Sequence, residues 1–407
     1  MHPILNDLTR HPTRRWARAL WLTLAVVGCG GGVESGGTGA APVSFASGPI
    51  TGFGSVIVNG VRFDDSSAGL IITRDGDDAG TTRSRDDLRL GMTTEIRGSA
   101  IAVDPVTDAA TSTASSIAVA SDLLGRVASV DLAGKRLVVL GQTVEVSATT
   151  VFDDATLSGG LAALGVGDVV EVYALFDAAT GHYRATRIER KGAVAAFRLR
   201  GPVSNLDTVA KTFNIGAERI SYLGLTAPAA ATPVNGAFLR VRLQPTPVGG
   251  VWLVAALSDG VQRPRDLDDV RLEGLVSAFT STAQFSVNGV AVDAHAITAP
   301  AGLALGARVE VEGTASGGVL VASKVKVKSA DEVDRQEFEL RDRITSVNLP
   351  AQTFVIRGVT VSYSLVAPAT DFRNGTVAHL AAGAGVEVRG VLSPDGSRLL
   401  AARITFR

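Results

Sequence analysis

The residues that could carry catalysis or bind a metal are few and lie far apart in the sequence. Beyond residue 29 the chain has three histidines, His182, His295 and His379, and none has a cysteine or a second histidine at ligand spacing. A catalytic triad or a zinc site needs two or more such groups that converge. The sequence also has no phosphate-binding loop, nucleophile elbow or nucleotide fingerprint. We therefore expect a protein that is not an enzyme and that uses no cofactor.

An acidic stretch, residues 75–86, is the sharpest hypothesis for a site; it reads DGDDAGTTRSRD. Its spacing echoes a calcium-binding loop, with Gly at position 6 and candidate ligands at positions 1, 3 and 12, which are Asp75, Asp77 and Asp86. However, position 5 is Ala79, position 12 is Asp instead of Glu, and two arginines bring opposing charge. We favour a solvated loop here and expect no bound metal.

The remaining candidates have structural interpretations. Asp153 and Asp154 follow a short apolar segment, where carboxylates commonly cap a turn. Neighbouring residues on a strand point to opposite faces, so this pair is a poor candidate for paired catalytic carboxylates. Aromatic side chains that could stack on bases or sugars are isolated, and we interpret them as core residues: Phe213, Phe285 and Phe354, with Tyr222 and Tyr363 further on.

The N-terminus has the pattern of an export signal. Four arginines between residues 10 and 18 precede the apolar run 19–27, which is shorter than the roughly 18 residues that span a bilayer. The run ends in Val26-Val27-Gly28-Cys29, which resembles the lipobox of bacterial lipoproteins; an ordinary secretory signal is the alternative. By this resemblance, residues 1–28 are a signal peptide, Cys29 carries the lipid, and the Gly at position 30 favours the outer membrane. The arginine pair within residues 13–16 leaves the twin-arginine export route open.

Residues 29–45 are rich in Gly, Ser and Ala and predict a flexible tether. Five related units follow it. Their anchor is a glycine three residues before a short alternating strand, and it recurs every 69–77 residues, as expected for an internal repeat. These glycines are Gly91, Gly167, Gly236, Gly306 and Gly383. We place the units at residues 46–120, 121–190, 196–260, 269–329 and 336–407, joined by short charged linkers that predict a string of adjacent domains.

Each unit predicts about five short strands and little helix. It opens on Gly-x-Val or a variant, continues with a hairpin such as 285–290, and ends on Ala-x-x-Ile or a variant. Five strands leave exposed edges unless they close into a ring, so we expect an all-β tandem array of five-stranded OB-like barrels. A small sandwich is the alternative. The segment before each anchoring glycine, such as 157–164, has room for one helical turn.

These motifs resemble the bacterial family catalogued as domain of unknown function 5666. Residues 48–63, GPITGFGSVIVNGVRF, and the later Leu90-Gly91-Met92 carry the resemblance, and the repeated Gly-x-x-Val-Glu-Val-x-Gly extends it over nearly all of 46–407. The third unit departs most, because it has Arg in place of the Glu and lacks the matching hairpin glycine. The resemblance implies OB-like barrels and secretion or lipid anchoring, and it implies no known reaction.

Composition fits this interpretation. Apolar residues make up 46% and charged residues 19% of the chain, and the formal net charge is −1, so nucleic acid is not an expected partner. We expect a non-enzymatic binding or assembly module of the cell envelope, held at the membrane by its N-terminal lipid, with an envelope protein or a polysaccharide as its partner. One alternative binds oligosaccharide or another polymer on its barrel faces; the other is an enzyme with a site between repeats.

Overall fold

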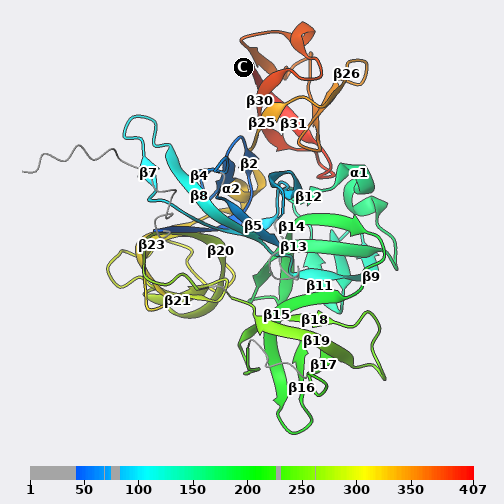
Figure 1. The fold of residues 1–407 in the computed structure, drawn as a ribbon, viewed down its shortest axis with the longest axis vertical. Coiled ribbons are helices and arrows are strands. Elements are labelled where there is room, and N and C mark those ends of the chain that lie inside the picture. Colours follow the sequence, from blue (N-terminus) through cyan, green and yellow to red (C-terminus); the bar gives the residue numbers. More distant parts are fainter. Residues whose placement is uncertain (1–42, 68, 75–82, 226–230, 262) are drawn as a thin grey trace, which may run out of the picture. The chain divides into compact units, whose positions relative to one another are not determined.

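The computed structural model describes residues 43–407, apart from residues 68, 75–82, 226–230 and 262. These residues form five small β-barrels, numbered here as repeats 1 to 5 in chain order (Figure 1). Alternation of apolar and polar residues explains each strand: in the fourth principal strand of repeat 4, Val309 and Val311 are buried, whereas Arg308 before them and Glu310 between them are partly exposed. The all-β fold predicted from the sequence is confirmed.

The elements follow the order expected from the sequence. Repeat 1 consists of β1 (Ser44–Pro49), β2 (Gly52–Phe53), β3 (Val56–Val58), β4 (Val61–Asp64), β5 (Ile71–Arg74), η1 (Arg85–Asp87), β6 (Thr93–Gly98), β7 (Ala102–Val103) and β8 (Ala110–Val119). Repeat 2 consists of β9 (Leu123–Asp131), β10 (Arg136–Val139), β11 (Gln142–Glu145), β12 (Val151–Phe152), α1 (Asp154–Leu157), η2 (Gly160–Ala163), β13 (Val169–Asp177) and β14 (His182–Lys191).

The other three repeats are built in the same way. Repeat 3 consists of β15 (Phe197–Asp207), β16 (Thr212–Ile215), β17 (Glu218–Ser221), β18 (Phe238–Leu243) and β19 (Trp252–Asp259). Repeat 4 consists of β20 (Leu267–Ser281), β21 (Gln284–Val287), β22 (Val290–Asp293), β23 (Arg308–Ser316) and β24 (Val319–Val327), and the one-turn helix α2 (Ala330–Asp334) follows it. Repeat 5 consists of β25 (Phe338–Arg343), β26 (Ser346–Asn348), β27 (Thr353–Ile356), β28 (Val359–Ser362), β29 (Asp371–Arg373), η3 (Val377–His379), β30 (Gly385–Leu392) and β31 (Leu399–Phe406).

The five principal strands of each repeat close into a ring. In repeat 4 the first strand, β20, pairs with the second, β21, and with the fourth, β23, and β21 pairs with the third, β22. The ring closes because β22 runs parallel to the fifth strand, β24, which is antiparallel to β23. Repeats 2 and 3 have the same pairings. This is the order of an OB-type barrel, so the barrel rather than the sandwich is correct.

The anchoring glycines form a turn that ties the first strand of each barrel to the fourth. We call the anchoring glycine and the residue after it the closing turn. The amide of the glycine donates to the carbonyl of a residue in or directly after the first strand, and the amide of that residue donates back to the carbonyl of the residue after the glycine, at 2.8–2.9 Å. Every anchoring glycine has a φ between 77° and 90°, a conformation that strains any residue with a Cβ. The pairs are Ile50 with Gly91, Val127 with Gly167, Val203 with Gly236, Val276 with Gly306 and Ile344 with Gly383.

A β-bulge explains the last two motifs of the repeat. In all five barrels the pairing of the fourth and fifth strands slips by one residue just after the Ala of Ala-x-x-Ile or its equivalent. In repeat 4 the slip follows Ala322, which lies opposite Gly313, the last residue of Gly-x-x-Val-Glu-Val-x-Gly. A Cβ on Gly313 would collide with the carbonyl oxygen of Val321. The bulge brings backbone this close, and glycine is therefore required.

The second and third strands are joined by two-residue turns. In repeats 1 and 4 the turn is Asn-Gly with both residues at positive φ, as the sequence predicts. Repeat 3 has no glycine at the matching second turn position, as the sequence predicts; Gly216, with a φ of 56°, takes the first turn position instead. A turn with its glycine at the first position serves the same hairpin.

The barrels are joined by more than linkers. Strand β1 pairs in parallel with β20 of repeat 4, β2 pairs in parallel with β25 of repeat 5, and β9 pairs antiparallel with β15 of repeat 3. The linkers predict adjacent barrels, and these pairings add contacts that the order along the chain does not indicate, because repeat 1 pairs with repeats 4 and 5. This is possible because the beginning of a first strand pairs with the fourth strand of its own barrel along one edge and can pair with another repeat along the other edge.

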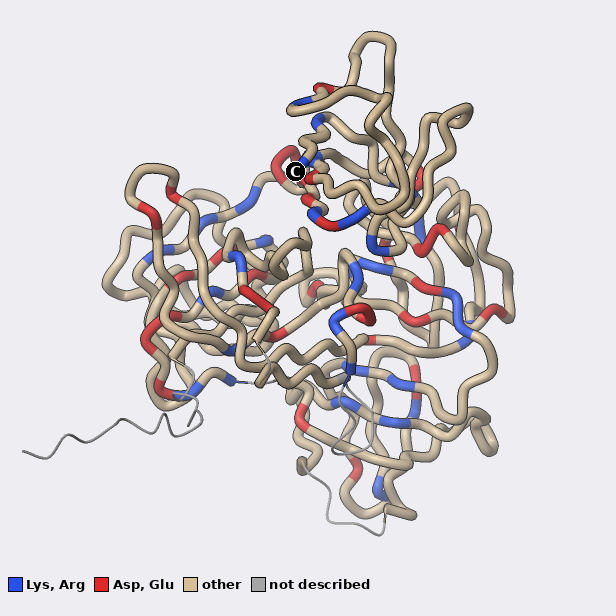
Figure 2. Tube along the Cα trace, turned by 45° about the horizontal axis from the view of Figure 1, so that its top comes forward, with Lys and Arg blue, Asp and Glu red and all other residues tan. Residues whose placement is uncertain are grey.

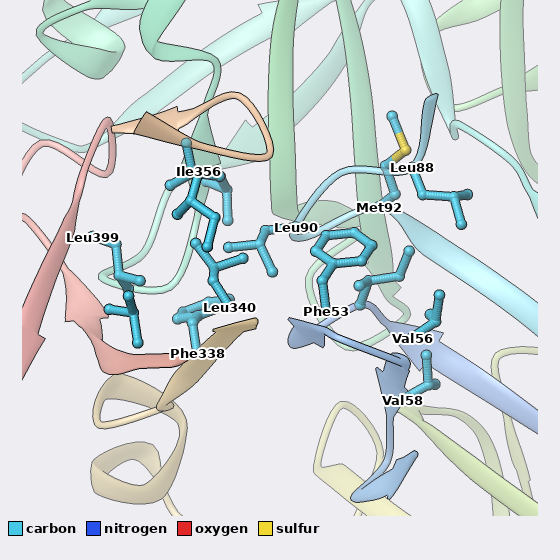
Figure 3. Packing of buried hydrophobic residues seen from close by; sticks show 14 of the residues in the cluster. Phe53, Val56, Val58, Leu88, Leu90, Met92, Phe338, Leu340, Ile356 and Leu399 are labelled. Atoms are coloured by element: carbon cyan, nitrogen blue, oxygen red, sulfur yellow. The ribbon is translucent and has the colours of Figure 1, made fainter. Parts of the chain in front are cut away.

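Each barrel is filled by aliphatic side chains, and one hydrophobic cluster crosses the repeat boundary. Phe53 and Leu90 of repeat 1 belong to the same buried cluster as Leu340 and Ile356 of repeat 5 (Figure 3). This shared core buries apolar area that two separate barrels would leave in water.

Some boundaries differ from those expected. The tether was placed as far as residue 45, but β1 begins at Ser44 because Phe45 is buried. β20 begins at Leu267, two residues before the expected start of its unit. The linker after repeat 4 contains the helical turn α2, capped by Ser329. In the part of the chain that is described, no helix is both long and apolar enough to cross a bilayer.

The closing turns predict a graded set of alanine substitutions. Gly383→Ala should destabilise the protein by about 1 kcal/mol, because the left-handed backbone is strained but a Cβ there meets nothing within 4 Å. Gly91→Ala should cost about 2–3 kcal/mol more, since its Cβ would collide with the carbonyl oxygen of Thr186. Gly192→Ala, in open space, is the control. Urea midpoints measure the order, and equal effects at Gly383 and Gly91 would contradict it.

Candidate functional site

The Glu of Gly-x-x-Val-Glu-Val-x-Gly forms an ion pair with a basic residue at the end of the fifth strand. The pairs are Glu171 with Lys191 at 2.9 Å, Glu310 with Lys328 at 2.6 Å, and Glu387 with Arg407. The two strands are adjacent, and the basic residue lies two positions beyond the residue that faces the Glu across the ladder. The recurring Glu thus has a structural partner in repeats 2, 4 and 5.

Some of these carboxylates are deeply buried. The side chain of Glu273, which faces Glu310 across the ladder, is 2% exposed and binds Arg308 at 2.7 Å and Lys328 at 3.0 Å. Burial alone would raise the pKa of Glu273, but the charges of Arg308 and Lys328 outweigh it and lower the pKa. A carboxylate held ionised in this way is poorly suited to accept a proton in catalysis.

Repeat 3 replaces the recurring Glu by an arginine and gathers three more beside it. Arg198 of β15 lies directly opposite Arg242 of β18, and Arg200 lies opposite Arg240. Like charges opposed across a ladder destabilise a sheet unless other groups compensate them. Two carboxylates from outside repeat 3 compensate the charges of Arg198 and Arg200.

Repeat 2 and the segment before it supply those carboxylates. Glu171, whose side chain is 1% exposed, binds Arg198 at 2.8 Å. Asp122 binds the guanidinium of Arg200 at 2.9 Å, and its other oxygen accepts the amide of Ala174 at 2.9 Å. Arg200 is held further by its own amide, which donates to the carbonyl of Asp122 at 2.9 Å. The arginines of repeat 3 therefore act as a charged joint between repeats.

A polar cavity of about 290 Å³ lies at this joint. Arg200 and Arg240 line it together with Asp122 and Glu95, so its charges balance. Hydroxyl groups of Thr93 and other residues complete the lining, and they offer both donors and acceptors. The cavity has the chemistry to hold a small polar molecule or water.

A second hollow is larger and mostly apolar. It has a volume of about 690 Å³, and residues of repeats 2 and 5 line it together with the end of α2. Leu132, Val391 and Leu400 contribute side chains that are 39–57% exposed. Charged residues of both signs stand at its edge, including Lys135 and Asp395. Figure 2 likewise shows acidic and basic residues interspersed along the barrels instead of gathered by sign.

The three histidines do not converge. His182 contacts Glu145 at 2.8 Å in repeat 2, and His295 contacts Asp293 at 2.7 Å in repeat 4. The ring of His379 accepts the amide of Thr376 in repeat 5. Among the residues that the structure describes, no group of three or more His, Cys, Asp or Glu side chains could hold a metal ion.

The candidate calcium ligands are only partly described. Asp75 and Asp77 lie outside the described residues, as does Cys29. Asp86 is exposed in η1, where its amide donates to the hydroxyl of Ser84 in an N-terminal cap.

The carboxylate pair of repeat 2 lies at a turn, but the predicted capping by its side chains is not found at Asp153, which makes no side-chain hydrogen bond to the backbone of α1. Asp153 stands at the N-terminus of the single helical turn α1 and accepts a hydrogen bond from the hydroxyl of Thr156 at 2.7 Å. Asp154 is the first residue of that turn.

The aromatic residues belong to the cores, as the sequence predicts. Phe213, Phe285 and Phe354 are at most 4% exposed, and Tyr363 is 5% exposed. Tyr222 is half-buried beside Phe213.

Sequence reasoning noted the arginine of repeat 3 that replaces the recurring Glu, but it missed the cluster of four arginines and the partner Asp122. A signal was present, because Arg240 takes the place of the recurring Glu and, together with Arg198, Arg200 and Arg242, gives four arginines that alternate along two strands. Which carboxylates they would meet depends on contacts between distant segments, and sequence spacing does not give those.

The fold and these motifs define a tandem array of small OB-type barrels. The model of a family described as domain of unknown function (DUF5666) matches residues 125–189, 273–326 and 343–405. The predicted resemblance to this family is thus confirmed in repeats 2, 4 and 5, the repeats in which the recurring Glu pairs with a basic residue. No curated protein matches the chain.

The charged joint predicts strong coupling between repeats 2 and 3. In a double-mutant cycle, Arg198→Met and Glu171→Gln should show a coupling energy of about 2 kcal/mol, because removing one partner leaves the other buried and incompletely paired. The control is the exposed pair Lys324–Glu312, at 2.8 Å, for which Lys324→Met and Glu312→Gln should couple by less than about 0.5 kcal/mol. Equal coupling energies in the two cycles would show that the ion pair between Glu171 and Arg198 does not couple repeats 2 and 3.

Glu189 predicts a loss of stability in acid. Burial alone would raise its pKa, but Arg187 and Lys191, each 2.5 Å away, lower the pKa to about 2 from an ordinary value of 4.5. Between these values the unfolded chain binds more protons, so stability falls as the pH falls from 4.5 towards 2. Glu189→Gln should flatten this slope in urea titrations, whereas the exposed Glu337→Gln should leave it unchanged. An identical slope in wild type and Glu189→Gln would show that this carboxylate does not contribute.

Proposed function

We propose that the protein is a non-enzymatic, lipid-anchored module of the bacterial cell envelope that binds or assembles with other envelope components through its barrels. The observation that carries the proposal is the use of the charged residues. Three carboxylates form ion pairs with arginines of other repeats: Asp122, Glu171 and Glu339. These charged side chains therefore join one barrel to another. A module built in this way presents several barrel surfaces in one fixed unit.

The N-terminal sequence supports the membrane anchor. The arginine-rich start, the short apolar run and Cys29 at its end have the order of a lipoprotein signal. A single lipid chain gives only marginal binding to a membrane, so a lipoprotein gains from further contacts through its folded part. Weak contacts by several barrels of one chain add through effective concentration.

Exposed apolar side chains on each repeat support contact with a partner. Val106, Leu132, Val209, Phe279 and Val366, one from each repeat, are between 38% and 92% exposed. Phe279 is the one large aromatic side chain among the exposed hydrophobic residues of the described chain. Polymer binding by stacking would need several such aromatics close together, so a protein partner is better supported than a polysaccharide.

The test is photo-crosslinking of the full-length chain in intact cells, with a probe at each of these five positions. We expect probes on at least two repeats to capture the same envelope protein, identified by mass spectrometry. Metabolic labelling with a palmitate analogue should mark the wild type and not Cys29→Ala, and Cys29→Ala should lose the captures. Capture of glycan alone would contradict the proposal and favour polymer binding. Capture of no envelope protein above the level of the Cys29→Ala control would also contradict it.

A further inference from the structure

Two of the hairpins between the fourth and fifth strands pack their tips against another repeat. The tip of repeat 5 lies on repeat 2, where the amide of Phe152 donates to the carbonyl of Gly396 at 2.9 Å. The tip of repeat 2, residues 177–181, lies on the closing turn of repeat 4. Docking of a hairpin tip on a neighbouring barrel is therefore a contact that this chain already makes within itself.

The contact between repeats 2 and 4 depends on a glycine. The tip is a five-residue turn in which the carbonyl of Asp177 accepts the amide of Gly181 at 2.8 Å, and Oδ1 of Asp177 accepts the amide of Ala179 at 2.9 Å. A Cβ on Gly306 would lie 2.6 Å from Oδ1 of Asp177 and 2.9 Å from Cβ of Ala179. This docking therefore requires a receiving turn without a side chain.

Repeat 1 has the same turn, and its tip is exposed. The carbonyl of Asp104 accepts the amide of Asp108 at 2.9 Å, and Oδ1 of Asp104 accepts the amide of Val106 at 2.8 Å. Asp108, with a φ of 57°, takes the place of Gly181, whose φ is 74°. Val106 takes the place of Ala179 and is 90% exposed. The tip is thus a preformed copy of a docking element with a larger apolar side chain.

The closing turn of repeat 2 has the features of a receiving surface. A Cβ on Gly167 meets nothing within 4 Å, so the space above this glycine is open, as it also is at Gly236 and Gly383. Of these three, Gly167 alone follows a large apolar residue, Val166, which is 74% exposed and corresponds to Leu305 before Gly306. Arg126 donates to the carbonyl of Gly167 at 3.2 Å and brings positive charge to the turn.

We propose that the tip of repeat 1, residues 104–108, docks on the closing turn of repeat 2 in a second copy of this chain. Val106 would pack beside Val166, and the carboxylates of Asp104 and Asp108 would face Arg126. The contact uses different surfaces on the two copies, so it links chains head to tail. It deepens the proposed function and rests on it, since it names a second copy as one assembly partner.

The first test is cross-linking between cysteines in full-length chains. The chain has one natural cysteine, Cys29, which the proposed lipid blocks. Val106→Cys and Val166→Cys chains with different tags are expressed in one cell and treated with a short bismaleimide. The control pairs Val166→Cys with Val209→Cys, which is 92% exposed in a matching turn whose Asp207 caps Val209 at 2.9 Å.

We expect the Val106–Val166 pair to yield at least about five times more mixed dimer than the control pair. Equal yields, or capture of another protein or of lipid in place of a second copy at Val106, would overturn the inference. The proposed function is tested separately by the photo-crosslinking experiment, and it fails if the probes on all five repeats capture no envelope protein.

A charge reversal gives the second test. Asp108→Lys is structurally mild, because Lys135 and Lys211 adopt the same left-handed conformation in related turns, with φ values of 50° and 56°. Asp108→Lys alone and Arg126→Glu alone should each lower the yield of mixed dimer by up to about fivefold, the range of an exposed ion pair. The two changes together should restore it. Failure of the double variant to recover would exclude this pairing of tip and turn.

Discussion

The closing turn is the constraint on which the rest of each barrel depends. Two backbone hydrogen bonds between a first-strand residue and a glycine turn hold the ends of the first and fourth strands together, and the glycine adopts a φ that other residues reach only with strain. Once this register is set, the bulge in the fifth strand and the parallel pairing of the third strand can close the ring. The recurring motif is therefore a geometric requirement of a small closed barrel, and no catalytic role is needed to explain its glycines.

Electrostatics then joins the barrels. In repeats 2, 4 and 5 the recurring Glu pairs with a basic residue of its own repeat, and in repeat 2 it also binds an arginine of repeat 3, whose arginines reach carboxylates outside that repeat. A buried ion pair adds little net stability, but an unpaired buried charge costs much, so such pairs favour one arrangement over others. Because these charges face one another at the joints, the surfaces left to partners are hairpin tips, closing turns and the apolar hollow. This division is what we expect of a module that assembles with other molecules.

Much of the fold could be predicted from the sequence, because strand alternation, the Asn-Gly hairpins and the spaced glycines are local signals. The five-stranded barrel followed from strand count and the need to close edges. Contacts between distant segments could not be predicted: the sequence places Asp122 at the boundary of two repeats, but nothing local indicates that it meets Arg200. Likewise, the sequence did not reveal that β1 pairs with β20, since pairing across about 220 residues depends on packing and leaves no periodic signal. The lipid anchor at Cys29 stays a prediction.

Native-state hydrogen exchange at the five closing turns tests the central claim most directly. If these turns hold the barrels closed, the amides of Gly91, Gly167, Gly236, Gly306 and Gly383 should exchange only through opening of the whole barrel, at rates that fall within the range of the buried strands. Their protection should far exceed that of the exposed tip at Val106. If the glycine amides exchanged as fast as the amide of Val106, the barrels would stay closed without the turns, which would contradict the central claim.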